Sequence, residues 1–189
     1  VMTSRLPLSN VYLVSEYDGN DDIVLKDPTS IGRPLSTEGE SLSVSFNGQS
    51  HINTRVKRFG KSSVQFVAAT DNLEATTVPD SFQFEDGDFT IEAYIRQDTT
   101  GVGANSIFTI YDDSTNYLEF KFAAANALSI TSRRGGSSIT ALGGPEAGRT
   151  TSNYAPREFM HVAASFDNQA QKMRLFRNGN LIQDTAFAA

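Results

Sequence analysis

The sequence predicts an all-β fold in which two antiparallel sheets pack as a sandwich. Short segments in which apolar and polar residues alternate recur along the chain, and Gly, Asn, Asp or Ser residues bound them. No window shows the apolar stripe of an amphipathic helix. Many short strands at regular spacing are typical of an antiparallel sandwich.

Four strands are expected in the first part of the chain. In residues 42–46, Leu42, Val44 and Phe46 point to one face, because side chains of a strand alternate with a period of two. The other three expected strands span residues 11–17, 63–69 and 72–78.

The middle of the chain carries the clearest alternation. In FTIEAYI (residues 89–95), the phenylalanine, both isoleucines and the alanine share one face, whereas Glu92 and Tyr94 lie on the other. In YLEFKFA (residues 117–123), the leucine and both phenylalanines share one face, opposite a glutamate and a lysine. A further strand is expected between these two, over residues 106–111.

The strongest local prediction is a β-hairpin over residues 172–185, KMRLFRNGNLIQDT. The Asn-Gly pair at positions 178–179 supplies the positive φ angles that a two-residue turn requires. Such a turn predicts two cross-strand pairs, Phe176 with Leu181 and Leu175 with Ile182. The strands expected before this hairpin span residues 127–132, 137–142 and 159–166, and residues 143–156 are expected to form a long loop.

Length and composition indicate one globular domain. A chain of 189 residues can bury a two-layer core, so we expect an N-terminal arm over residues 1–10 and one domain over residues 11–189. No apolar run approaches the roughly 18 residues that span a bilayer, so no membrane partner is expected. Residues 1–10 lack the apolar core of a signal peptide, so the chain is either not secreted by that route or already processed. The absence of cysteine excludes disulfides and Cys-based zinc sites.

The charge pattern argues against a nucleic-acid partner. The net charge is −6, and the sequence contains no basic stripe that could neutralise phosphates. The one local exception is RVKRFGK, residues 55–61. We interpret it as a solvated strand edge and loop, where lysines also discourage edge-to-edge pairing. A contact for an acidic glycan or an acidic subunit is the alternative.

Four blocks follow one another along the chain in a characteristic order. They are VYLVSEYDGND (11–21), RFGKSSVQFVAATDNLEATTVPDSFQFEDGDFTIEAYIR (58–96), SIFTIYDDSTNYLEFKF (106–122) and REFMHVAASFDNQAQKMRLFRNGNLIQ (157–183). Together they resemble the laminin-G-like, concanavalin A-like jelly-roll domains, of the kind found in phage and bacterial surface proteins. The resemblance implies a two-sheet jelly-roll sandwich.

The chain departs from this family pattern in two respects. The family usually has a tryptophan beside the histidine and another on the glutamate-bearing strand, where this chain has Met160 and Tyr94. The family also usually continues beyond the final hairpin into closing strands, whereas this sequence stops at Ala189. The jelly roll is therefore expected to lack its last strands here, and either further sequence or a partner is expected to supply them.

Paired carboxylates are the first candidates for chemistry, because relatives of this fold that cleave glycans carry two acids a few places apart on one strand. Retaining cleavage needs the two carboxyl groups about 5–5.5 Å apart. Asp88 and Glu92 have a spacing that points both to one face, which is nominally suitable. However, Asp88 lies in the turn sequence EDGD, where aspartate commonly bonds local backbone amides. The other acidic motif, EYDGND at residues 16–21, is broken by an Asp-Gly turn, so no catalytic residues are expected.

Histidine and metal chemistry have little support in the sequence. His161 is expected to fill or hydrogen-bond the core, since no nucleophile-elbow pattern accompanies it. Calcium suits the oxygen-rich turns at residues 18–22 and 111–116, although the first lacks the glycine and distal glutamate of an EF-hand. Both are interpreted first as ordinary hairpin turns, so no cofactor is expected and calcium is the alternative. The calcium candidates are Asp18, Asn20, Asp22, Asp112 and Asp113.

Sugar binding requires an aromatic ring beside polar groups. Tyr94 lies between Glu92 and Arg96 on the wet face of its strand, so these three are the candidate glycan-binding residues. Tyr111 and Tyr117 are expected in or near loops, with half-buried rings and wet hydroxyls.

The family resemblance, the absence of cysteine and the expected incomplete sheet together imply a non-enzymatic structural component of a virion or surface assembly. Phage capsid-associated, tail and fibre proteins are examples, and the virion or the extracellular surface is the expected location. The expected partners are other subunits or further copies of the chain. A carbohydrate-binding module for attachment to host glycans is the alternative function, and a glycoside hydrolase is the third.

Overall fold

A computed structural model of the chain describes residues 23–24, 43–58, 63–74, 87–97, 105–123, 127–144 and 158–187. Every regular element in these ranges is a β-strand, and every strand pair is antiparallel, which confirms the all-β fold class. No helix in these ranges is long and apolar enough to cross a membrane. The chain divides into two compact units, residues 1–84 and residues 85–189. The expectation of one domain over residues 11–189 stays a prediction.

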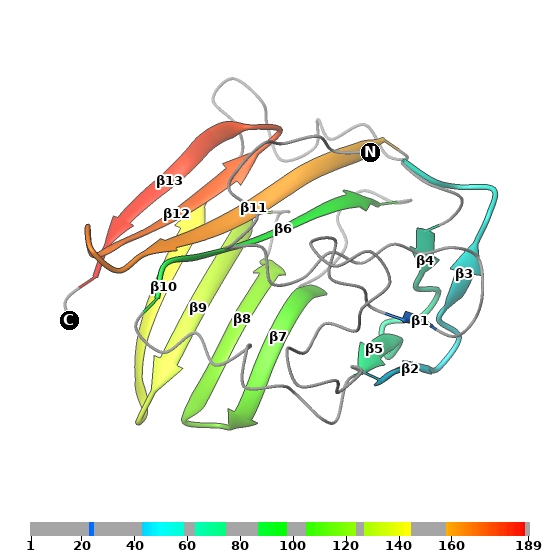
Figure 1. The fold of residues 1–189 in the computed structure, drawn as a ribbon, viewed down its shortest axis with the longest axis horizontal. Helices are drawn as coiled ribbons and strands as arrows, with labels where there is room; N and C mark the ends of the chain where they lie inside the picture. Colours follow the sequence, from blue (N-terminus) through cyan, green and yellow to red (C-terminus); the bar gives the residue numbers. More distant parts are fainter. Residues whose placement is uncertain are drawn as a thin grey trace. The chain divides into compact units, whose positions relative to one another are not determined.

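The described residues of the first unit form five short strands (Figure 1). They are β1 (Ile23–Val24), β2 (Ser43–Asn47), β3 (His51–Asn53), β4 (Ser63–Gln65) and β5 (Asn72–Glu74). One sheet has the order β1-β2-β5, and β3 pairs with β4. β2, β4 and β5 begin within one residue of the predicted starts. The strand predicted over residues 11–17 lies outside the described residues.

A basic segment of the first unit follows a strand as an exposed loop, which agrees with its prediction as a solvated strand edge and loop. Residues 54–58 form an irregular segment after β3, and Arg55, Lys57 and Arg58 are exposed on it. Asp71 organises the neighbouring loops, because its Oδ1 accepts the backbone N–H of Gln49 at 2.8 Å.

The described part of the second unit forms two four-stranded sheets (Figure 1). The first sheet, in the order β13-β12-β11-β6, consists of β6 (Phe89–Arg96), β11 (Phe159–Asp167), β12 (Lys172–Arg177) and β13 (Asn180–Ala186). The second, in the order β10-β9-β8-β7, consists of β7 (Asn105–Asp113), β8 (Asn116–Phe122), β9 (Leu128–Arg134) and β10 (Ser137–Gly143). These strands confirm every strand predicted from residue 89 onward, and the two antiparallel sheets confirm the jelly-roll sandwich.

The core of the second unit follows the predicted alternation. On β8, Leu118, Phe120 and Phe122 are buried, while the glutamate and the lysine between them face outward. The two sheets meet closely at Gly143 of β10. A Cβ atom added at this glycine would lie 2.8 Å from Cδ1 of Ile182, on β13. Only a residue without a side chain leaves that space to the isoleucine.

The β12–β13 hairpin confirms one predicted cross-strand pair and corrects the other. Asn178 and Gly179 have φ angles of 48° and 81°, as the predicted turn requires. Phe176 pairs with Leu181 as predicted, but Leu175 pairs with Gln183, so the predicted pair of Leu175 with Ile182 is wrong. A β-bulge lies between these two pairs and inserts Ile182 as an extra residue. The bulge turns Ile182 toward β10, where it packs against Gly143.

Candidate functional site

Three outward side chains on β6 and β11 lie together, and we call them the β6–β11 cluster: Glu92, Tyr94 and His161. The antiparallel register sets His161 opposite Tyr94. The His161 Nε2 atom lies 3.2 Å from Glu92 Oε2. The His161 and Tyr94 rings are tilted by 43°, with centroids 4.9 Å apart. A carboxylate, an imidazole and a phenol ring therefore form one contact surface.

The cluster lies on the exposed side of its sheet. The β6 side chains alternate between partly buried and exposed positions as far as Ile95, and Glu92 and Tyr94 occupy exposed ones. The Glu92 side chain is 52% exposed and the His161 side chain 18%. His161 was expected to fill or hydrogen-bond the core. Its side chain is mostly buried, but it lies on the outward face opposite Tyr94 and its hydrogen-bond partner is Glu92.

The β12–β13 turn holds the backbone of His161. The Asn178 backbone N–H donates to the His161 carbonyl oxygen at 2.8 Å, and the His161 N–H donates to Asn178 Oδ1 at 3.0 Å. Through these two bonds Asn178 extends the pairing between β12 and β11 by one residue beyond the end of β12. The turn residue fixes the strand position from which His161 reaches Glu92.

Arg96 lies on the same face of β6 as Tyr94, opposite Phe159, and it is partly buried. The structure thus brings Glu92 and Tyr94 together with a histidine that the sequence had not grouped with them. Glycan binding by Glu92, Tyr94 and Arg96 stays a prediction.

The paired acids lack the geometry of a glycosidase. Positions four apart on a strand are separated by about 13 Å, since each residue advances the chain by about 3.3 Å. Retaining enzymes need about 5–5.5 Å and inverting enzymes about 6.5–9.5 Å between carboxyl groups. Asp88 also has another role, because its Oδ1 accepts the backbone N–H of Asn168 at 2.6 Å. This bond ties the start of β6 to the β11–β12 turn, so the local turn bonding expected for Asp88 is replaced by a long-range contact.

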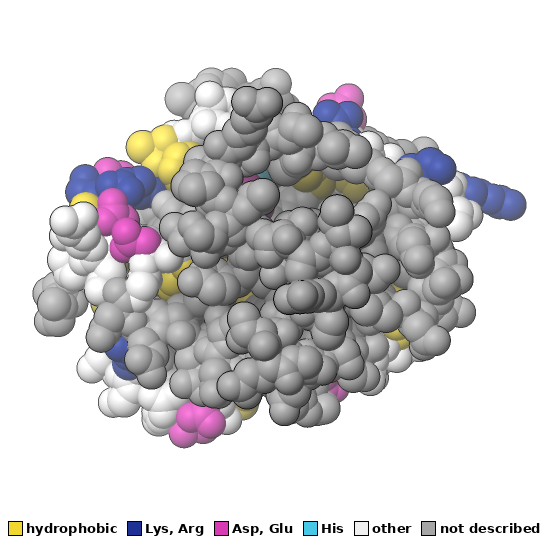
Figure 2. Space-filling model, in the orientation of Figure 1, with side chains coloured by type: hydrophobic (Ala, Val, Ile, Leu, Met, Phe, Trp, Pro, Cys, Tyr) yellow, Lys and Arg dark blue, Asp and Glu magenta, His cyan; other side chains and the backbone are white. Residues whose placement is uncertain are grey.

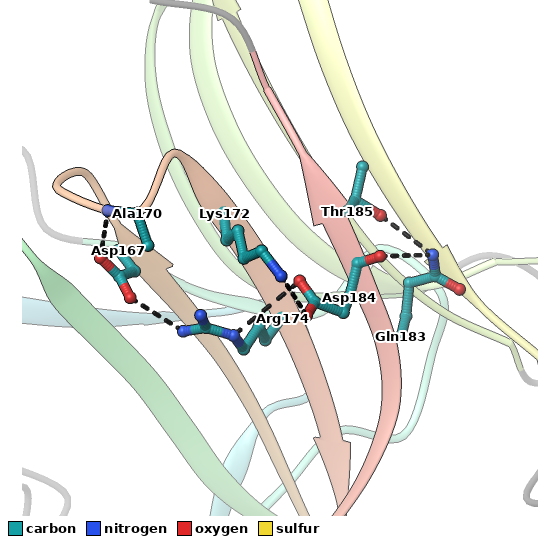
Figure 3. A network of polar contacts seen from close by, with 7 residues as sticks. All are labelled: Asp167, Ala170, Lys172, Arg174, Gln183, Asp184 and Thr185. Atoms are coloured by element: carbon teal, nitrogen blue, oxygen red, sulfur yellow. Dashed lines mark hydrogen bonds and ion pairs between the residues drawn. The ribbon is translucent and has the colours of Figure 1, made fainter.

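A network of opposite charges occupies the other end of the same face, near the β11–β12 turn (Figure 3). Arg174 on β12 donates from Nη1 to Asp167 Oδ2 at 3.0 Å, and its Nε lies 3.9 Å from Asp184 Oδ1. Lys172 donates to Asp184 Oδ2 at 2.8 Å. The Ala170 backbone N–H and Arg174 hold the pKa of Asp167 below its usual value. The two positive and the two negative charges of this network thus neutralise one another across β11, β12 and β13.

One part of the visible side shows a similar mixture of charges. At the left of the space-filling view, acidic and basic side chains lie next to one another (Figure 2).

The turn candidates for calcium have local partners where they are described. Asp113 Oδ1 accepts the backbone N–H groups of Thr115 at 2.6 Å and Asn116 at 2.8 Å, and also the Thr115 hydroxyl at 2.7 Å. These bonds, led by the Thr115 hydroxyl, lower the pKa of Asp113. The neighbouring Asp112 is exposed. No group of three His, Asp or Glu residues in the described ranges could hold a metal ion. The candidates Asp18, Asn20 and Asp22 lie outside the described residues, so calcium binding stays a prediction.

Tyr111 and Tyr117 lie near the β7–β8 turn, as expected. They lie on β7 and β8, directly opposite each other across the β7–β8 hairpin. The spacing in the sequence does not give this pair, because Tyr111 lies two residues before Asp113 whereas Tyr117 lies one residue after Asn116. A β-bulge between Tyr111 and Asp113 shifts the register and brings the two tyrosines opposite each other.

Comparison with protein families gives one match. Residues 68–189, more than half of the chain, match the family model of the concanavalin A-like lectin/glucanases superfamily. A comparison with curated proteins finds no match. The matched region contains all eight strands of the second unit.

Proposed function

We infer that this chain, which belongs to the concanavalin A-like lectin/glucanases superfamily, is a non-enzymatic structural domain of a virion or surface assembly. It acts by contact, through outward sheet faces that bind other subunits or further copies of the chain. Phage capsid-associated, tail and fibre proteins are the assemblies that fit this role.

The β6–β11 cluster is the observation that carries the proposal. Glu92 and Tyr94 are exposed, and His161 contacts both of them. Such a surface offers charge, hydrogen bonds and an aromatic ring to a partner. It does not offer the second carboxylate that glycoside hydrolysis requires, because Asp88 is about 13 Å along the strand.

The position of β6 in its sheet gives further support. Within the described ranges β6 pairs with one strand, β11, and the register is regular from Phe89 to Arg96. The backbone groups along the edge of a regular strand can pair with a strand of another chain. A subunit contact at β6 would bury the side chains of the cluster together with this edge.

Sedimentation velocity tests this role. We expect the purified chain to self-associate or to bind the other proteins of its native assembly. Tyr94→Ala should weaken the association, whereas Thr90→Ala, on the same strand face, should weaken it less. A chain that stays monomeric at every concentration and binds no protein of that assembly would contradict the proposal.

Attachment to host glycans is a second candidate function. The observation that favours it is the exposed Tyr94 ring beside a carboxylate and an imidazole, since a ring flanked by polar groups can orient a sugar. A glycan array separates the two candidates. Binding that is lost in Tyr94→Ala favours recognition at this cluster, and a blank array favours the structural role alone.

A further inference from the structure

Strand β6 carries a row of outward side chains whose charge changes sign along the strand. The row contains Glu92, Tyr94 and Arg96, at every second position. A carboxylate therefore precedes the tyrosine by two residues, and a guanidinium follows it by two residues. In a second strand of the same sequence that runs in the opposite direction, the order of the charges is reversed. Two antiparallel copies of β6 are thus complementary to each other.

The position of β6 leaves one of its edges for such pairing. Within the described ranges the sheet has the order β13-β12-β11-β6, so β6 lies at its end (Figure 1). The register with β11 is regular over all eight residues of β6, from Phe89 to Arg96. A regular strand of this length presents a row of backbone N–H and C=O groups with which another strand can pair.

We propose that β6 of one copy pairs antiparallel with β6 of a second copy, about a two-fold axis that passes beside Tyr94. Pairing about this residue sets Glu92 of each copy opposite Arg96 of the other. Tyr94 then lies opposite its own equivalent, and the two four-stranded sheets join into one sheet. The inference rests on the proposed function, and it names the partner as a second copy of the chain.

The inward face of β6 fits the same register. Ala93 and Ile95 are partly buried on this face. Pairing about Tyr94 sets Ala93 of each copy opposite Ile95 of the other. Apolar side chains directly opposite each other stabilise neighbouring strands. The apolar layer beneath each sheet would therefore continue across the two-fold axis.

Other registers bring the charges together less well. Pairing about Glu92 sets two carboxylates directly opposite each other, and like charges in that position are destabilising. Pairing about Ala93 or Ile95 leaves Glu92 without a cation opposite it. A two-fold axis that passes between two residues would set outward side chains opposite inward ones, because the facing changes with every residue. Pairing about Tyr94 therefore gives the register in which both charges of the row meet an opposite charge.

Contacts within each copy hold the pairing side chains in place. The His161 Nε2 atom lies 3.2 Å from Glu92 Oε2, and the His161 ring lies 4.9 Å from the Tyr94 ring, centre to centre. Both side chains of β6 are thus positioned before a second copy binds, which lowers the entropy cost of association. A carboxylate accepts several hydrogen bonds, so Glu92 can bind the guanidinium of the second copy and keep its contact with His161.

Cysteine cross-linking tests the position of the two-fold axis, because the chain has no cysteine of its own. Directly opposite residues of an antiparallel pair have Cα atoms about 4.5–5.5 Å apart, which suits a disulfide. With oxidised glutathione as the oxidant, we expect Tyr94→Cys to form a disulfide-linked dimer. Thr90→Cys is the matched control on the same face. It should not cross-link, since the two copies of position 90 would lie about 26 Å apart along the strands. Equal cross-linking of both variants would overturn the inference.

Exchange of the two charges tests the register, with sedimentation equilibrium as the measurement. Glu92→Arg and Arg96→Glu each set like charges opposite each other, so each should weaken self-association by roughly ten-fold or more. The double variant restores opposite charges in the reverse order and should recover most of the affinity. Urea unfolding checks that all three variants are folded. A double variant that associates as weakly as either single variant would overturn the inference.

The same sedimentation measurements separate self-pairing from the wider structural role. A wild-type chain that stays monomeric but binds another protein of its native assembly would overturn the self-pairing and leave the structural role intact. A wild-type chain that neither self-associates nor binds such a protein would contradict both.

Discussion

His161 on β11 contacts Glu92 on β6, with 3.2 Å between Nε2 and Oε2, although 69 residues separate them in the sequence. The contact exists because antiparallel pairing sets Ala163 opposite Glu92 and His161 opposite Tyr94, on the same face. The sheet thereby gathers an acid, a base and an aromatic ring on its outer side. The same pairing places Asp88 too far along the strand to act with Glu92 as a catalytic pair.

Asn178 should govern the position of His161 through its side-chain oxygen. Asn178→Asp keeps an acceptor for the His161 N–H, so its stability should stay close to that of the wild type. Asn178→Ala loses this acceptor and must adopt a positive φ angle, so it should lose about 2 kcal/mol. Urea unfolding measures both variants. Equal losses for alanine and aspartate would show that the side-chain hydrogen bond contributes nothing.

Gly143 should be coupled to Ile182 across the sandwich. A Cβ at position 143 meets the end of the Ile182 side chain, so Gly143→Ala should lose about 1–3 kcal/mol by overpacking. Ile182→Val removes the Cδ1 atom that would clash and alone should cost about 0.5–1.5 kcal/mol. The double variant should lose less stability than the sum of the losses of the two single variants. A double-mutant cycle by urea unfolding measures this difference. Strict additivity would mean that the sheets do not meet at this point.

Asp113 should stabilise the β7–β8 turn in a manner that depends on pH and not on calcium. Its folded-state pKa is lowered, so its charged form stabilises the fold above the unfolded pKa of about 3.9. This stabilisation is lost as the pH falls through the lower folded-state pKa. Asp113→Asn should therefore be less stable than the wild type at neutral pH, and the difference should shrink in acid.

Thermal melting from pH 7 to pH 2 measures the effect, with and without EDTA. Thr131→Val, which has no ionisable group, is the control for general acid effects. If calcium raised the melting temperature of the wild type and not that of Asp113→Asn, the turn would be a metal site instead.

Local patterns predicted most strands of the second unit, because alternation decides which face of a strand is buried. The sequences around Phe120 and Ile91 show this alternation directly. The Asn178-Gly179 turn was equally readable, since few other residues adopt these φ angles.

The remaining features depend on contacts between residues far apart in the sequence, so local patterns could not predict them. The bulge at Ile182 depends on how closely β10 approaches at Gly143, which no local pattern encodes. The outward position of His161 depends on its pairing with a strand far away in the sequence. Tyr111 and Tyr117 needed the hairpin register before they could be recognised as one pair.

We propose that this domain binds and does not cleave. Release of reducing ends from a panel of polysaccharides, compared between the wild type and Glu92→Gln, tests it most directly. We expect no release above the background by either protein. Release by the wild type that disappears in Glu92→Gln would contradict it, because Glu92 would then be a catalytic carboxylate.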